Sequence, residues 1–399
     1  MKKIIFLIAF LVISCKSRKV VSSFDLSSLS DSVNIEYDSH IYIKSNIANV
    51  NANFLFDTGA DGLYLDSVFI AKSKVKFGAL AYGKTSGVGI KEERIRVIRD
   101  SIYYKINNFN LKSPMTPILQ LRPIIGKKID GIIGNATFTN KTILIDYINQ
   151  KLFVFKSFNE EMVKDFKKIS IRKVNNRYFV NASINAIKDT TIEGDFMIDL
   201  GAGCVIDITN ETAVQNALDD KIVNQVICNS SNAGIGGFAS FSFFTTKSIS
   251  LSDFGIKKEI ICYSNNKTGA LSDRSYVGLI GNGFFERFDV ILDFENKYMY
   301  LRPNANYHKK PINYNLGFSY IDRTDIGVGF IVTSLFEGSD VEKKGLKLGD
   351  IITHVNDVSM NDIKDFSILN KAKNNQKIKL KFSRNNISHE IYFITNDLF

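Results

Sequence analysis

The stretch that decides the fold of this protein occurs twice. Residues 54–66 read FLFDTGADGLYLD, and residues 196–208 read FMIDLGAGCVIDI. In each, an apolar run typical of a buried strand leads into an aspartate, Asp57 or Asp199, and a glycine follows two residues later. A carboxylate at such a turn is held at the mouth of an apolar core.

Two further matched segments follow in the same order. Residues 130–135 (DGIIGN) correspond to residues 277–282 (VGLIGN), and the strand-like run at 143–147 corresponds to 290–294. Each copy also carries a glycine-rich turn between its first and second segments. Such ordered self-similarity predicts a duplicated domain of roughly 120–150 residues per copy.

The composition is that of a globular protein, and the pattern of short apolar runs predicts that it is mainly β. Of the 399 residues, 45% are hydrophobic and 23% are charged, as in ordinary globular proteins. Short runs of Ile, Val, Phe and Tyr alternate with turns rich in Asn, Asp, Gly and Ser, which is typical of strands. Within the two copies, helices are expected only at residues 160–167 and at residues 211–218, the second after the cap-like Thr209.

The net charge argues against a nucleic-acid partner. The formal charge is +10, but residues 1–24 alone hold five basic and no acidic residues. The rest of the chain is therefore close to neutral, whereas a nucleic-acid-binding protein usually carries a basic face.

The N-terminus is typical of an export signal. Lys2 and Lys3 precede an apolar run at residues 4–13, which is too short for a stable membrane anchor. The run ends at Ser14-Cys15, which resembles a bacterial lipobox and implies a signal peptide at 1–15. Lipidated Cys15 would then hold the protein on a membrane of the cell envelope, facing the periplasm. An ordinary signal peptide with an incidental cysteine is the alternative.

A polar, serine-rich tether is expected at residues 16–33. The remaining cysteines, Cys204, Cys228 and Cys262, allow one disulfide at most. The four histidines are isolated in the sequence, and no Cys/His cluster suggests zinc. We therefore expect no metal and no cofactor.

The duplication gives the two aspartates a chemical role. If the copies pack about a pseudo-two-fold axis, equivalent loops meet, and Asp57 faces Asp199. Two carboxyl groups in contact in a dry site cannot both ionise, so they share one proton. The charged partner can act as a general base on a water molecule while the protonated partner donates to a substrate carbonyl.

These motifs resemble the aspartic proteases of the retroviral and pepsin type. More narrowly, the chain resembles bacterial single-chain aspartyl protease lipoproteins with a C-terminal PDZ domain. The resemblance implies β lobes at 34–160 and 161–302 that together form a bilobal retropepsin-like fold, and a monomeric endopeptidase that cleaves an extended polypeptide. By the same resemblance, the catalytic residues are Asp57 and Asp199. The residues that support their loops are Thr58, Gly59, Leu200 and Gly201. The residues of the flaps are Ser86, Gly87, Gly89, Gly234 and Gly236.

One position departs from the family pattern. Leu200 stands where the family has Thr or Ser, whose hydroxyl ties the two aspartate loops together. Leu200→Thr is expected to restore such a bond, worth about 1 kcal/mol, unless Leu200 packs against the opposite lobe. A non-catalytic peptide-binding lipoprotein is the alternative to an active protease.

Residues 312–396 carry a different signature. Strand-like segments flank a short helix that Ser339 would cap and Gly345 would end, and a final hairpin would turn at Asn385-Asn386. A further helix is expected at residues 365–373. This order closely resembles a bacterial PDZ domain (an α+β fold), which binds the C-terminus of a peptide by strand addition.

The resemblance assigns the peptide carboxylate to the loop formed by Leu316, Gly317 and Phe318. The competing candidate is the segment at 327–330, whose glycines more simply form a hairpin turn.

Overall fold

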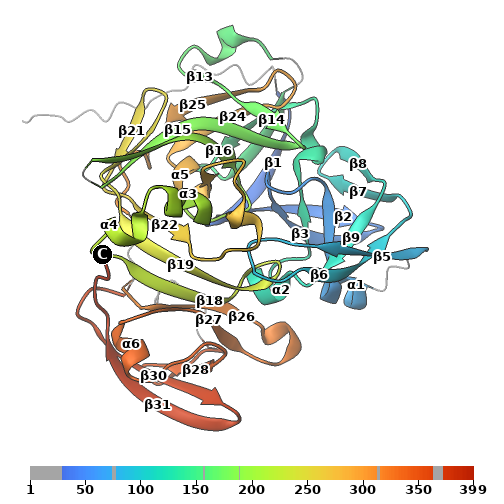
Figure 1. Ribbon diagram of the computed structural model, residues 1–399. Coiled ribbons are helices and arrows are strands. Elements are labelled where there is room, and N and C mark those ends of the chain that lie inside the picture. Colours follow the sequence, from blue (N-terminus) through green and yellow to red (C-terminus); the bar gives the residue numbers. More distant parts are fainter. Residues whose placement is uncertain (1–28, 74–77, 156–157, 188, 312–314, 363–371) are drawn as a thin grey trace, which may run out of the picture.

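A computed structural model describes residues 29–73, 78–155, 158–187, 189–311, 315–362 and 372–399. The fold is mainly β, as expected from the sequence, with short helices between strands. Two halves, residues 29–155 and 158–303, lie side by side, and a C-terminal domain lies below them in Figure 1. None of the helices in the described part of the chain has the length and apolarity that a bilayer crossing requires.

The elements of the first half are β1 (Leu29–Asp38), β2 (His40–Ile47), β3 (Val50–Phe56), β4 (Leu63–Asp66), α1 (Ser67–Ser73), β5 (Leu80–Thr85), β6 (Glu93–Ile98), β7 (Ile102–Ile106), β8 (Phe109–Ser113), β9 (Thr116–Leu119), α2 (Arg122–Ile125), β10 (Gly131–Ile133), β11 (Thr142–Asp146) and β12 (Lys151–Phe155).

The elements of the second half are β13 (Lys167–Ser170), β14 (Arg172–Val174), β15 (Arg177–Ile187), β16 (Thr190–Ile198), β17 (Ile206–Ile208), α3 (Asn210–Gln215), α4 (Leu218–Lys221), β18 (Val226–Gly234), β19 (Gly237–Thr245), β20 (Ser248–Leu251), β21 (Phe254–Lys257), β22 (Ile260–Ser264), β23 (Gly278–Ile280), α5 (Asn282–Phe285), β24 (Phe288–Asp293) and β25 (Tyr298–Pro303).

The elements of the C-terminal domain are β26 (Phe318–Asp322), the 3-10 helix η5 (Thr324–Ile326), β27 (Phe330–Phe336), α6 (Asp340–Lys343), β28 (Ile351–Val355), β29 (Val358–Ser359), β30 (Lys377–Arg384) and β31 (Ile387–Ile394).

The same strand pairing occurs at the centre of both halves. In the first half, β10 is parallel to β3 and antiparallel to β4. In the second half, β23 is parallel to β16 and antiparallel to β17. Because β3 and β16 end immediately before Asp57 and Asp199, this pairing sets the position of both aspartate turns.

The two halves share a sheet and a core. In its strand order, β13-β25-β24-β11-β12-β1, three strands of the second half are followed by three strands of the first half, and β11 pairs with β24 directly. The largest apolar cluster runs from Val33 in the first half to Leu301 in the second. This continuous burial, the main source of folding free energy, fixes the halves against each other.

Two expectations need correction. Strand β1 begins at Leu29 and pairs with β12, so the last residues of the expected 16–33 tether belong to the fold. The helix expected at 160–167 is only the short 3-10 helix η3 (Glu160–Val163), because β13 begins at Lys167 and pairs with β25. Cys15, with the signal segment, lies outside the described residues.

The C-terminal domain has its own apolar cluster, centred on Phe318, Val332, Leu380 and Phe382. Ser339 caps α6, and the hairpin between β30 and β31 turns at Asn385 and Asn386, both at positive φ, as expected. Most of the helix expected at 365–373 lies outside the described residues.

Candidate functional site

Asp57 and Asp199 face each other across the junction of the two halves. A Cβ added to Gly59 would lie 3.0 Å from both Asp199 carboxylate oxygens, and one added to Gly201 would lie 2.3 Å from Asp57 Cγ. The carboxyl groups are close enough to share a hydrogen bond. Each of these glycines is therefore required because the opposite carboxyl group occupies the space of a side chain.

Each aspartate is held by its own turn. Asp57 Oδ1 accepts hydrogen bonds from the N–H groups of Gly59 (2.7 Å) and Ala60 (3.1 Å). Asp199 Oδ1 accepts one from Gly201 N (2.9 Å). The remaining carboxylate oxygens are therefore available for each other and for a ligand.

The surroundings favour protonation of this pair. Burial raises the pKa of Asp57 well above its ordinary range, and the neighbouring charge of Asp199 raises it further. Burial also raises the pKa of Asp199, although backbone N–H groups and Asp57 oppose this shift. Both side chains nevertheless keep partial solvent access. Two coupled carboxyl groups of this kind hold one proton over a range of pH.

A single hydroxyl joins the two aspartate loops. The buried Thr58 Oγ1 donates to Ile198 O (2.7 Å) and accepts from Leu200 N (2.9 Å). Leu200 is fully buried in the central core. Thr58 therefore bridges the loops by hydrogen bonds, whereas Leu200 contributes apolar packing.

Two asparagines that were not expected from the sequence support the aspartate loops. Asn135 Nδ2 donates to Thr58 O (2.5 Å), and Asn282 Nδ2 donates to Leu200 O (2.6 Å). Both residues end the matched segments at 130–135 and 277–282, so the repeat itself contained the signal. Tyr147 OH donates to Asn282 Oδ1 (2.8 Å) and so orients the Asn282 amide that contacts Leu200 O.

Two hairpins meet above the aspartate loops. The first joins β5 to β6 and the second joins β18 to β19. Their tips are linked by three backbone hydrogen bonds: Gly89 N to Ile235 O (2.9 Å), Ile90 N to Phe238 O (3.2 Å) and Lys91 N to Gly236 O (3.2 Å). Glu93 Oε1 also accepts from Gly236 N (3.0 Å).

The tips cross over to opposite halves. Val88, from the first half, packs on an apolar cluster of the second half that includes Met197 and Leu279. Ile235, from the second half, packs on a cluster of the first half that includes Leu55 and Ile132. Because these clusters also contact Ala202 and Ala60 of the aspartate loops, each tip packs on the same apolar cluster as one aspartate loop.

The expected flap residues thus lie in two groups that the structure brings together. Gly87 and Gly89 are in the first tip, and Gly234 and Gly236 are in the second, while Ser86 directly precedes the first group. A Cβ on Gly89 would lie only 2.1 Å from Gly236 C. Glycine is therefore required here because two backbones approach closely.

A second acidic group lies near Asp199. The Cys262 thiol donates to Asp207 Oδ1 (2.8 Å), and Cys204 is the other thiol beside this carboxyl group. Burial raises the pKa of Asp207 and of both thiols. The three cysteines at 204, 228 and 262 are free thiols. Within the described ranges, no His, Cys, Asp and Glu side chains form a group suited to a metal ion.

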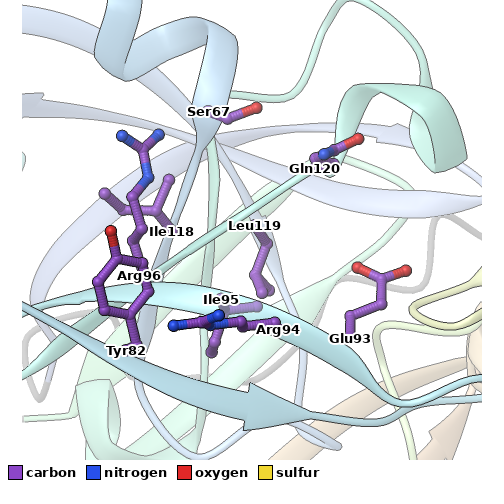
Figure 2. A pocket seen from close by; sticks show the side chains of 9 residues that line it. All are labelled: Ser67, Tyr82, Glu93, Arg94, Ile95, Arg96, Ile118, Leu119 and Gln120. Atoms are coloured by element: carbon purple, nitrogen blue, oxygen red, sulfur yellow. The ribbon is translucent and has the colours of Figure 1, made fainter.

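A cavity of about 330 Å³ opens elsewhere and is lined mainly by residues of the paired strands β6 and β9 (Figure 2). Arg94, Arg96, Tyr82 and Gln120 surround it, and Leu119 forms part of its apolar wall. Its lining includes neither aspartate loop.

In the C-terminal domain, Leu316 and Phe318 are buried in the core, and Gly317 lies between them at a φ of +77°. A Cβ on Gly317 would lie 2.5 Å from Ser339 Cβ, so this loop also depends on glycine. The competing segment at 327–330 forms the connection between β26 and β27.

Comparison with known families gives one match. No curated protein matches this chain. A PDZ domain model matches residues 307–383, close to the expected range of 312–396. Residues 307–383 are therefore a PDZ domain.

Proposed function

We propose that residues 29–303 form an aspartic endopeptidase. The observation that carries this proposal is the contact between the Asp57 and Asp199 carboxyl groups across the junction of the two halves. With one shared proton, the ionised carboxylate takes a proton from a bound water, and the protonated carboxyl group donates to the scissile carbonyl. The water oxygen then attacks the carbonyl carbon, and the dyad returns a proton to the leaving amine.

The repeated pairing of β3, β10 and β4 and of β16, β23 and β17 supports a bilobal retropepsin-like fold, with lobes at 34–160 and 161–302. On this proposal, the β5–β6 and β18–β19 hairpins are flaps that close over an extended polypeptide. Their glycine tips suit this role because a flap must bring its backbone against the substrate backbone.

The PDZ domain favours peptide binding whether or not the chain is catalytic. We propose that the N–H groups around Leu316, Gly317 and Phe318 receive the carboxylate of a peptide that adds as a strand to β26. A non-catalytic peptide-binding protein is therefore the second candidate function.

We further propose that the protein is exported and anchored to the bacterial cell envelope through lipidated Cys15. The basic residues, the apolar run and Ser14-Cys15 of the sequence support this localisation.

The dyad is tested by Asp57→Asn and Asp199→Asn. Each variant should lose cleavage of a denatured protein mixture by at least about 10³-fold, because each carboxyl group has a separate role. Mass spectrometry of the products measures this loss, and a statine-type inhibitor of pepsin-like proteases should inhibit the wild type. Asp253→Asn, at an exposed carboxyl group paired with Lys167, is the matched control. Retained cleavage in either dyad variant would show that the dyad does not catalyse it, and a wild type without any cleavage would favour the non-catalytic candidate.

A further inference from the structure

The second hairpin is also a strand of the PDZ sheet. Strand β18 pairs with β19 on one side and with β27 of the PDZ domain on the other, as Figure 1 shows. In the β18–β27 ladder, Cys228 faces Phe336, Asn229 faces Leu335 and Ser230 faces Ser334. These positions lie immediately before the tip at residues 231–237.

Side chains reinforce this ladder. Asn229 Nδ2 donates to Glu337 Oε1 (2.7 Å), and Ser334 Oγ donates to Ser230 Oγ (3.1 Å). Glu337 N donates to Ile227 O (2.8 Å). The hairpin tip therefore cannot lift from the aspartate loops unless β27 moves with it or the ladder breaks.

The PDZ domain is held to the first half as well. The Arg122 side chain is almost fully buried and places Nη1 2.8 Å from Asp325 Oδ2 of the PDZ domain. Lys127 Nζ lies 2.8 Å from Asp322 Oδ2, and Lys72 Nζ donates to Asp325 O (2.8 Å). The PDZ domain thus connects the first half to the hairpin of the second half.

Lys127 also contacts the backbone of β26, on the edge of the strand that does not pair with β27. This strand pairs with β27 along one edge, and at its far end Lys127 N donates to Asp322 O (2.9 Å). A Cβ on Gly126 would lie 3.4 Å from the same oxygen. A peptide that starts at Gly317 and adds to β26 reaches Asp322 after about four to five residues. A longer peptide then competes with Lys127.

We propose that the PDZ domain holds the second hairpin in its closed position through the β18–β27 ladder and through its contacts with Arg122 and Lys127. We call this set of contacts the brace. A peptide long enough to pair with Asp322 releases it. The inference rests on the proposed function in treating the covered site as a substrate cleft and in placing the peptide carboxylate at Gly317. Its test measures hairpin motion without any cleavage, so the two proposals can fail separately.

The brace is tested on the full chain by hydrogen exchange in the segments at 86–92 and 226–237. Asp325→Asn removes the PDZ carboxylate that Arg122 binds and leaves its partners Asp66 and Asp130 in the first half. We expect at least about fivefold faster exchange in both segments because local opening becomes easier. Asp357→Asn, at an exposed PDZ carboxyl group that pairs with Lys379 and Lys381, should leave exchange unchanged. Unchanged exchange in Asp325→Asn would overturn the brace.

A reversible disulfide between β18 and β27 tests the opposite change, in which opening of the hairpin becomes harder. Ser230 and Ser334 face each other, so the double variant Ser230→Cys/Ser334→Cys should form a disulfide between β18 and β27. The oxidised form should exchange at least about tenfold more slowly in the second hairpin than the same protein after reduction. Equal rates in the oxidised and reduced forms would show that the ladder does not limit opening.

The length dependence is tested with synthetic peptides. The tightest-binding member of an octapeptide library with free carboxyl ends is compared with its own C-terminal tetrapeptide. We expect the octapeptide to accelerate exchange as Asp325→Asn does and the tetrapeptide to leave it unchanged. A bound octapeptide without this effect, or a library without any binder, would contradict release by a peptide.

Discussion

Thr58 and Leu200 occupy the same position in the two aspartate loops but hold them together differently. The Thr58 hydroxyl already binds Ile198 O and Leu200 N, while the Leu200 side chain is fully buried in the shared core. The departure from Asp-Thr-Gly in the second copy thus exchanges a hydroxyl for apolar packing across the junction.

We predict that Leu200→Thr destabilises the protein. Burial of a leucine contributes about 1.5–3 kcal/mol, whereas a new hydrogen bond contributes about 1 kcal/mol. The free energy of unfolding should fall by about 0.5–2 kcal/mol on this balance, in contrast to the gain expected from the family pattern. Urea denaturation measures the change, and Val214→Thr, at an exposed helix position, is the control. A stabilised variant would contradict the packing account.

The raised pKa values of the dyad predict how stability depends on pH. Because the folded-state pKa of Asp57 and Asp199 lies above the unfolded value of about 4, the native state binds more protons between these values. The stabilisation from the dyad is therefore fully present below about pH 4 and is lost as pH rises through the folded-state pKa.

The pH dependence of this stabilisation is measured by subtracting the free energy of unfolding of the double variant Asp57→Asn/Asp199→Asn from that of the wild type, from pH 3.5 to pH 7.5. The difference should fall as pH rises. A difference that increases with pH would mean that the dyad is stabilised in its ionised form.

At the scale of elements, the closed site depends on the contact between two hairpin tips. Gly89 and Gly236 come so close that a side chain on either would strike the other backbone. The tips are therefore linked by steric fit as well as by hydrogen bonds.

We predict that Gly89→Ala separates the tips. Its Cβ would lie 2.1 Å from Gly236 C, so the hairpins must move apart. Hydrogen exchange of residues 226–237 should accelerate by about tenfold or more, because the hydrogen bonds between the tips are lost. Gly255→Ala is the matched control, since nothing lies within 4 Å of its added Cβ. Unchanged exchange in Gly89→Ala would show that the tips can adjust without opening.

Helix prediction succeeded where a local cap determines the element. Thr209 accepts a hydrogen bond from Thr212 N and caps α3, close to the expected start. The expected end at residue 218 is wrong, because α3 ends at Gln215 and Ala217 takes a left-handed conformation before α4. Asp66 accepts from Val68 N and Phe69 N in the same way and precedes α1, a helix that was not expected from the sequence. The expected helix at 160–167 was wrong because strand pairing with β25 overrides its local preference.

At the scale of the molecule, the two halves share one core and the PDZ domain has another. The contacts between them include a strand ladder, charged groups and the packing of Phe243 against Phe336 and Phe399.

The proposed anchor belongs to this scale. We predict that Cys15→Ser moves the exported protein from the membrane fraction to the soluble fraction and removes the mass of the acyl chains, because hydrophobic burial of those chains provides the attachment. Fractionation and intact mass measure both changes. A variant that stays with the membrane would require another attachment.

The sequence by itself determined the mainly β class, the repeated apolar-Asp-x-Gly segments and the PDZ domain, because each depends on residue types at short spacing. Only the tertiary structure decided that the two carboxyl groups meet, that each hairpin tip covers the opposite half, and that β18 joins the PDZ sheet. The β18–β27 ladder is made by backbone groups, which every residue carries, so no residue pattern in the strands specifies which edges pair. The carboxyl pair and the crossed tips join segments that are far apart in the sequence, so they depend on how the two halves pack.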